Sequence, residues 1–208
     1  MGRASRAQAA EHRDQIVAAA SRLFREQGSE VTLVELTGAV GLTTGAFYRQ
    51  FKSKDAILGE ATAHAFEDLR ALLDGFEAAH HGDHNAARAA FIDHYLAPEH
   101  RDDAAHGCPA SGLNATISRQ PADSQARQRY VHGVQGLASW LGPTPSTADQ
   151  HSPSNGGPGA ETAQVSDEAL GALCTMVGAL VLARATNGSA LSERILTSAH
   201  TSLATEDD

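Results

Sequence analysis

Two short helical segments separated by a glycine turn are the feature that most constrains how this chain can fold. Segments 32–40 and 43–51 each carry apolar residues at helical spacing, and Gly41 lies between them. A longer helix is predicted before Gly28, because apolar residues recur there at helical spacing: Ile16, Val17, Ala20, Leu23 and Phe24. Two helices joined by a short turn containing Gly are typical of a helix-turn-helix, whose second helix enters the major groove of DNA.

The start of the first short helix carries a capping signature. Thr32 is followed three residues later by Glu35, which is the spacing of the reciprocal capping box, where each side chain accepts a hydrogen bond from the other residue's backbone amide. Helix N-termini also present unpaired N–H groups to anions. The starts of both short helices are therefore suited to contact DNA phosphates.

The second short helix carries side chains that suit contact with DNA. Thr43 and Thr44 lie at its start, where hydroxyl and methyl groups can meet base edges, although Thr43 can equally be a plain helix cap. Arg49 can reach guanine or a phosphate, or it can be a solvated surface residue. Tyr48 is suited to bond a phosphate.

An ordered set of residues carries a resemblance to a known family: Ala20, Leu23, Phe24, Gly28, Thr32, Leu36, Val40, Gly41, Leu42, Gly45, Phe47, Tyr48, Phe51, Lys52, Lys54 and Leu58. Their spacing over about residues 11–60 resembles the N-terminal domain of the tetracycline-repressor (TetR) family of bacterial transcription regulators. Thr37 departs from the Ala that is usual in the family, and Gly45 lies in the recognition helix at a position that varies widely. Gly45 costs roughly 1 kcal/mol of helix propensity relative to Ala.

Charge is distributed unevenly along the chain. The formal net charge of −9 alone argues against nucleic acid, yet residues 1–60 carry eight Lys or Arg against seven Asp or Glu, and residues 61–208 carry eight against eighteen. Both lysines, Lys52 and Lys54, follow the recognition helix, where they would neutralise DNA phosphates and give salt-sensitive affinity. The resemblance implies this role for Lys54. The predicted DNA-binding residues are Thr32, Thr43, Thr44, Gly45, Tyr48, Arg49, Lys52 and Lys54.

The N-terminal segment 1–15 holds basic residues and lacks the apolar core of a secretory signal. Arg3, Arg6 and Arg13 can add DNA contacts from a flexible arm, although a solvated tail is the alternative for Arg3 and Arg6. The apolar run 169–183 is about 15 residues long, shorter than the ~20 that span a bilayer. Two cysteines do not make a disulfide framework. We therefore expect a cytoplasmic protein with no membrane contact.

Helical periodicity continues to the C-terminus, without strand-like alternation over a useful length. We expect an all-α protein of about nine helices, with an N-terminal three-helix helix-turn-helix domain at residues 1–54 and a C-terminal helical ligand-binding and dimerisation domain at residues 55–208. A long helix from Ser53 is predicted to link them. Segment 142–166 holds four of the seven prolines and is predicted to be a flexible loop. The other predicted helices cover residues 85–96, 109–118, 121–141, 167–185 and 191–203.

The last two predicted helices suggest assembly of two chains. Gly171 and Gly178 permit close helix approach, and apolar stripes run along both helices: Leu170, Leu173, Val177, Leu180 and Val181 on one, and Leu191, Ile195, Ala199 and Leu203 on the other. These stripes can instead be buried within one subunit. The resemblance implies a homodimer through helices 167–185 and 191–203 that binds a palindromic double-stranded DNA operator.

The predicted second domain contains no motif that names a ligand. The resemblance implies a small-molecule ligand that releases a repressor from its operator, while the sequence does not separate a repressor from an activator. The candidate ligand-binding residues, each of which can instead be plain core, are Phe91, Tyr95, Cys108, Leu113, Ile117, Tyr130, Val134, Leu137 and Trp140.

Cys108 allows an alternative function. It precedes Pro109 at a predicted helix start, and a helix N-terminus lowers the pKa of a thiol and increases its reactivity. The chain could therefore be a ligand-binding or redox- and electrophile-sensing protein acting through Cys108, although a small buried residue is the other interpretation. Cys174, within an apolar segment, is predicted to pack in the core.

Histidine-rich segments raise the question of metal binding and catalysis. Segment 80–84 has poor spacing for a metal site, and a solvated turn is the better interpretation. An enzyme would use Cys108 as a nucleophile with His106 or His132 as the base, but nothing supplies a third orienting group or an oxyanion-binding loop. We therefore expect no catalytic residue, no metal site and no cofactor.

Overall fold

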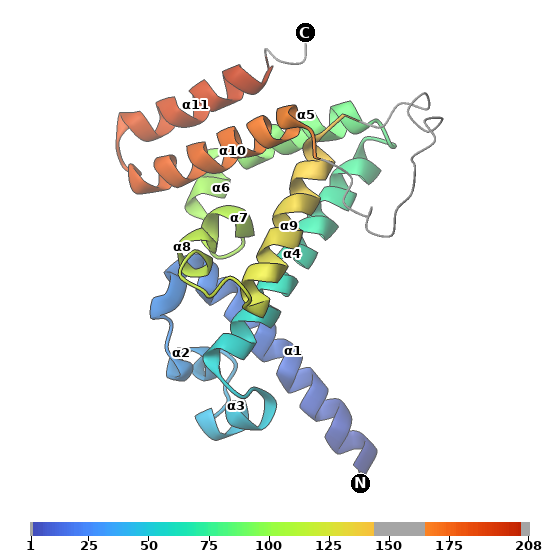
Figure 1. Ribbon diagram of the computed structural model, residues 1–208, viewed down its shortest axis with the longest axis vertical. Coiled ribbons are helices and arrows are strands. Elements are labelled where there is room, and N and C mark those ends of the chain that lie inside the picture. The colour runs from blue at the N-terminus through green and yellow to red at the C-terminus, as the bar shows by residue number, and fades with distance from the viewer. Residues whose placement is uncertain (1, 144–164, 205–208) are drawn as a thin grey trace. The chain divides into compact units, whose positions relative to one another are not determined.

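The computed structural model describes residues 2–143 and 165–204, which form helices and no strand (Figure 1). The prediction of an all-α fold is therefore confirmed. In chain order, the elements are α1 (Gly2–Gln27), the 3-10 helix η1 (Gly28–Glu30), α2 (Leu33–Gly38), α3 (Thr44–Gln50), α4 (Lys54–Ala79), α5 (His84–Tyr95), α6 (Pro98–Asp102), α7 (Pro109–Gly112), α8 (Asn114–Ile117), α9 (Gln125–Leu141), α10 (Asp167–Ala185) and α11 (Ala190–Ala204).

The described residues contain eleven α-helices, where the sequence predicts about nine. The predicted helix 109–118 is interrupted at Leu113, so α7 and α8 are two short helices. Helix α6 has only five residues, too few to show a hydrophobic period. Of the predicted flexible loop at 142–166, residues 144–164 lie outside the described residues.

The N-terminal segment is helical, so the predicted flexible arm is wrong. Helix α1 begins at Gly2 and continues without a break to Gln27. Its first half is rich in alanine and has no proline, and alanine is the strongest helix former. Arg13 therefore occupies a fixed place on a helix, where its side chain contacts other elements of the fold.

The chain divides into two compact units that interleave in sequence. The first unit combines the segment ending at Leu72 with Pro98–Gly133, and the second combines Leu73–Ala97 with the segment from Val134 onward. Helices α4 and α9 each contribute to both units. The domain boundary predicted between residues 54 and 55 stays a prediction.

One hydrophobic cluster joins the helices of the first unit. The cluster includes Phe24 of α1, Leu36 of α2 and Phe47 of α3, which are almost completely buried. Leu113 and Ile117, at the ends of α7 and α8, belong to the same cluster. The helix-turn-helix is therefore stabilised by residues 98–133 as well as by its own three helices.

Arg25 fixes the end of α1 against the segment before α7. Its guanidinium is buried and donates from Nη1 to the Gly107 carbonyl oxygen at 3.1 Å, while Nη2 lies 3.8 Å from a carboxylate oxygen of Asp68. Burial lowers the pKa of the Arg25 guanidinium, and the Asp68 carboxylate opposes that shift. Gly112 allows this packing, because a Cβ atom there would lie 3.1 Å from the Arg25 side chain.

Aromatic side chains occupy the interior of the second unit. The Phe91 ring lies 5.2 Å from the Trp140 ring and 5.7 Å from the Phe76 ring, both in edge-to-face geometry. His84 bonds to the Glu77 carboxylate through Nδ1 and to the Gly142 carbonyl oxygen through Nε2 at 3.0 Å. These contacts connect α5 to the ends of α4 and α9.

Helix α10 is a core helix of the second unit. Among the described residues it alone is long and apolar enough to cross a membrane by length and composition, with a mean hydropathy of 1.5. Seven of its residues are nevertheless buried in the unit. The Ser192 hydroxyl of α11 also donates to the Ala183 carbonyl oxygen at 2.8 Å. The predicted packing of Cys174 is wrong, because Cys174 lies on the exposed side of α10.

Two glycines of α9 should respond oppositely to replacement by alanine. A Cβ atom at Gly133 would lie 2.2 Å from the Phe66 ring, whereas a Cβ atom at Gly136 would meet nothing within 4 Å. Both replacements gain helix propensity of about 1 kcal/mol, but Gly133→Ala also adds overpacking of about 1–3 kcal/mol. We expect Gly136→Ala to raise the free energy of unfolding and Gly133→Ala to lower it in chemical denaturation. Equal stabilisation by both would contradict this packing.

Candidate nucleic-acid interface

The capping box at the start of α2 is present, as predicted. The Thr32 hydroxyl oxygen accepts a hydrogen bond from the Glu35 amide at 3.2 Å, and the Glu35 carboxylate accepts one from the Thr32 amide at 2.7 Å. This hydrogen bond from the Thr32 backbone is the main reason that the pKa of Glu35 is lowered. Thr32 is exposed, so its place at the helix start leaves it accessible to DNA.

The turn between α2 and α3 depends on two residues. Gly41 has a φ of +66°, a conformation that glycine adopts without strain. Thr37 is buried, and its hydroxyl donates to the Leu33 carbonyl oxygen at 2.9 Å. This bond explains how a threonine is accommodated where the resemblance would place an alanine. The amide of Leu42 donates to the Thr37 carbonyl oxygen and closes the turn.

Helix α3 has one buried side and one exposed side. The Thr43 hydroxyl caps the helix by accepting from the Ala46 amide at 3.3 Å, so the capping role considered for Thr43 is realised. Phe47 is fully buried and packs on Phe51, with ring centroids 5.3 Å apart. Tyr48 is 60 % exposed, an unusual exposure for a large aromatic side chain. The other predicted DNA-contacting residues on α3 are also exposed: Thr44, Gly45 and Arg49.

The two lysines differ in their surroundings. Lys52 is exposed in the turn after α3. The ammonium group of Lys54 donates to the Ser29 carbonyl oxygen and lies 6.0 Å from the centre of the Phe24 ring. Lys54 therefore already has contacts within the first unit, whereas Lys52 is the lysine more accessible to a phosphate.

A groove of about 430 Å³ lies beside the recognition helix in the first unit. Its lining contains two groups that can carry positive charge and no carboxylate: Gln8, Ala9, His12, Leu42, Ala46, Arg49 and Gln50. Gln8 and His12 are not among the predicted DNA-binding residues, because a flexible arm is predicted for the N-terminal segment. The alanine-rich composition of that segment was the signal that could have placed them on a helix.

The candidate ligand-binding residues are divided between the two units. The first unit holds Cys108, Leu113, Ile117 and Tyr130, and the second holds Phe91, Tyr95, Val134, Leu137 and Trp140. Leu113 and Ile117 are part of the hydrophobic cluster of the first unit, in agreement with the core role considered for them. The Tyr130 hydroxyl donates to the Ala110 carbonyl oxygen at 2.6 Å, and burial raises the pKa of Tyr130 to about 12.

Trp140 carries a buried donor. Its indole Nε1 has no hydrogen-bond partner in the described part of the chain. A buried donor without an acceptor costs free energy, so Trp140 Nε1 favours an acceptor that the described residues do not supply. Trp140 also stacks edge-to-face with His84, at 5.2 Å between ring centroids.

Cys108 lies at the N-cap position of α7 and is buried. Its backbone amide donates to His100 Nε2 at 3.0 Å, so that ring nitrogen is the unprotonated one. His106, considered as a base for Cys108, instead bonds to the Asp103 carboxylate. Within the described segments, no group of three His, Cys, Asp or Glu residues is placed to hold a metal ion.

Comparisons with known proteins match the helix-turn-helix segment by sequence and the whole chain by fold. The model of the bacterial regulatory proteins of the tetR family matches residues 16–61, which include α2 and α3. No curated protein matches the chain. A crystal structure of the reduced form of NemR from E. coli shares the fold, with a TM-score of 0.71 and 19 % identity over 94 % of this chain and 96 % of that chain.

A second solved structure gives the same result. It is a transcriptional regulator of the TetR family from Cytophaga hutchinsonii, with a TM-score of 0.68 and 19 % identity over 95 % of this chain and 96 % of that one. At this identity, the similarity establishes the fold, while the helix-turn-helix is matched in its own right. Residues 16–61 are therefore similar to the DNA-binding part of bacterial regulatory proteins of the tetR family, and the chain is a DNA-binding transcriptional regulator.

Proposed function

We propose that the protein is a cytoplasmic homodimeric repressor that binds a palindromic operator through α3 and is released by a small-molecule ligand. The observation that carries the DNA-binding part is the exposed side of α3. Thr44, Gly45, Tyr48 and Arg49 are exposed there while Phe47 holds the opposite side in the hydrophobic cluster. Direct contact with bases requires polar side chains on a helix whose opposite side is held in place by packing.

The exposed side chains divide into two roles. Thr44, at the first position of α3, supplies a hydroxyl and a methyl group that can meet base edges. Tyr48, Arg49 and Lys52 supply donors and charges for phosphates, which position the protein without specifying sequence. The groove lined by His12 and Arg49 offers a further place for a phosphate, since its lining carries no carboxylate.

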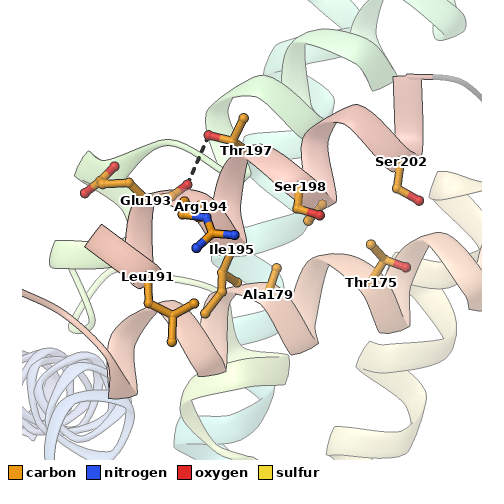
Figure 2. Close-up of a pocket in the computed structure, with 10 residues that line it drawn as sticks. Thr175, Ala179, Leu191, Glu193, Arg194, Ile195, Thr197, Ser198 and Ser202 are labelled. Carbon is orange, nitrogen blue, oxygen red and sulfur yellow. Dashed lines mark hydrogen bonds between the residues drawn. The ribbon is translucent and has the colours of Figure 1, made fainter. Parts of the chain in front are cut away.

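Dimerisation would use a surface groove of about 760 Å³ between α10 and α11. Figure 2 shows the lining side chains from both helices, among them Thr175, Leu191 and Ser198. The outer surface of α10 adds exposed apolar residues: Leu170, Val181 and Leu182. A second copy of the chain is the occupant we propose, because a palindromic operator is bound by a protein with two-fold symmetry.

The ligand part of the proposal rests on the second unit. Its aromatic interior contains Phe91, Tyr95 and Trp140, and the Trp140 N–H offers a donor to a ligand. Helices α4 and α9 extend through both units and would carry the effect of the ligand to the DNA-reading helices. Such release requires that the ligand binds one arrangement of the dimer more tightly than the other.

Two alternatives make different predictions. An activator would bind the same operator but raise transcription when bound. A sensor acting through Cys108 would lose operator binding on oxidation, and Cys108→Ser would abolish that response. The burial of Cys108 limits access of a reagent to its thiol.

Selecting duplexes from a random DNA pool with reduced protein tests the proposal. Recovery of a palindrome supports it, and no enrichment would contradict it.

Thr44→Ala and Lys52→Ala should affect binding to DNA in different ways. Thr44→Ala should change the preference at one operator position by roughly five- to tenfold, because it removes a group aimed at base edges. Lys52→Ala should weaken binding to all duplexes and reduce the slope of log affinity against log salt by about 1.8, because the dimer loses one phosphate contact in each subunit. Equilibrium binding across a salt series measures both. Parental behaviour in both variants would show that α3 is not the recognition helix.

Gly178→Leu should dissociate the dimer and leave the single chain folded. A Cβ atom at Gly178 would meet nothing within 4 Å among the described residues, but a leucine side chain there would obstruct close approach of a partner helix to α10. Gly75→Leu is the matched control, because Gly75 is also a helical glycine with open space around its Cβ position. Sedimentation should show a monomer for Gly178→Leu and a dimer for Gly75→Leu, with equal helical circular dichroism. Dimers in both would argue against this surface.

Binding of a releasing ligand should change the fluorescence of the protein. Trp140 is the only tryptophan in the sequence, so the emission reports on the aromatic interior of the second unit. Compounds are first screened for release of labelled operator DNA and then titrated against the emission. Trp140→Phe should weaken release by roughly two- to tenfold, because a hydrogen bond is lost while a ring remains. Release without any change in emission would place the ligand elsewhere.

A further inference from the structure

Arg13 contacts three residues of the first unit at once. Its Nη1 donates to the carbonyl oxygen of Gln50, the last residue of α3, at 2.7 Å. Its Nη2 pairs with the Glu60 carboxylate of α4. Its Cζ lies 4.4 Å from the centre of the Phe51 ring, close enough for a cation–π interaction. A single side chain of α1 thus holds the end of the recognition helix and the helix that follows.

The hydrogen bond from Arg13 to Gln50 satisfies a carbonyl oxygen at the C-terminal end of α3. The last carbonyl groups of a helix have no partner within the helix, and they carry partial negative charge. An arginine at that end supplies both a donor and a positive charge. The side-chain amide of Gln50 donates in return to the Ala9 carbonyl oxygen at 3.1 Å, so α1 and α3 are joined in both directions.

Helix α3 needs such an attachment because it is short. Its seven residues are fixed at the N-terminus by the Thr43 cap and in the middle by the buried Phe47. Neither contact sets the direction of its last turn, which carries Arg49 and leads to Lys52. The contacts of Arg13 lie at that end, together with the Gln50 side-chain bond to Ala9 and the buried ring of Phe51.

We infer that Arg13 is a positioning residue for DNA recognition, which orients the C-terminal end of α3 through Gln50, Phe51 and Glu60 and does not itself bind DNA. This inference rests on the proposed DNA contacts of α3. It replaces the expectation that Arg13 binds DNA from a flexible arm, because the guanidinium is already used by three groups within the unit. Glu60 contributes to the same positioning, because its carboxylate pairs with Nη2 of the Arg13 guanidinium.

The direction in which Glu60→Gln changes the affinity for DNA distinguishes a positioning role of Arg13 from a direct contact between Arg13 and DNA. Replacing Glu60 by Gln removes a negative charge from the DNA-reading unit, and charge alone predicts tighter binding to DNA. Loss of positioning predicts the opposite, because Arg13 loses the partner that fixes it. A direct phosphate contact by Arg13 would also contribute to the salt slope, whereas an internal contact would not.

The test compares Arg13→Ala, Glu60→Gln, the double variant and Arg13→Lys in the full-length chain. Arg22→Ala is the matched control, because Arg22 is an exposed arginine of the same helix. Binding to the selected operator and to a scrambled duplex is measured across a salt series. We expect Arg13→Ala and Glu60→Gln each to reduce operator affinity by roughly three- to tenfold and to lower the ratio of operator to scrambled affinity, with the double variant no weaker than Arg13→Ala. Arg13→Lys should not restore the parental affinity, because lysine lacks the planar guanidinium group that donates in two directions.

Hydrogen exchange of the free protein provides a readout that does not need DNA. The Phe51 amide donates to the Phe47 carbonyl oxygen at 2.9 Å and closes the last turn of α3. We expect its exchange to accelerate in Arg13→Ala and Glu60→Gln and to stay at the parental rate in Arg22→Ala. Because this measurement is independent of operator binding, it still decides whether Arg13 holds the end of α3 if the parent protein binds no duplex.

Three results would overturn the inference. One is a salt slope that falls by about 1.8 in Arg13→Ala together with tighter binding by Glu60→Gln, which would mean a direct phosphate contact in each subunit. Another is parental specificity in both single variants. The third is unchanged exchange of the Phe51 amide, which would show that the end of α3 is held by other contacts.

Discussion

Burial of Phe47 is the interaction on which the DNA-reading surface depends. A helix as short as α3 is not stable by itself in water, so its structure comes from packing. Phe47 is inserted among Phe24, Leu36 and Phe51 in the cluster of the first unit. Because that side of α3 is fixed, the opposite side has a defined orientation. The orientation of such a surface is therefore set by buried apolar side chains.

The same cluster extends beyond the helix-turn-helix. Leu113 and Ile117 place α7 and α8 against it, so the segment 98–133 stabilises the DNA-reading helices directly. Cys108 and Tyr130 belong to this unit as well. A chemical change at either residue would act on the packing around α1, without passing through the second unit. Cys108 and Tyr130 are therefore connected to the DNA-reading helices within a single unit.

Local patterns made part of this structure predictable. The capping box of Thr32 and Glu35 and the turn at Gly41 involve residues close in sequence, so their spacing is informative by itself. The pairing of Arg13 with Glu60 joins residues 47 positions apart, and nothing in the sequence marks them as partners. A helical stripe likewise tells which side of a helix is apolar but not which element covers it. The candidate ligand-binding residues therefore divide between two units, and Cys174 lies on the surface.

The segment before α7 contacts the end of α1, and α8 contacts the start of η1, and these two points of contact limit how α7 and α8 can move. At the first point, the buried Arg25 guanidinium bonds to the Gly107 carbonyl oxygen, and Asp68 is a weaker partner because it is half-exposed and lies farther away. At the second point, a Cβ atom at Gly28 would lie 3.3 Å from the Thr116 hydroxyl. Displacing α7 and α8 would deprive a buried cation of an acceptor, which is costly unless α1 follows. Movement of these helices and reorientation of the start of the helix-turn-helix are therefore coupled.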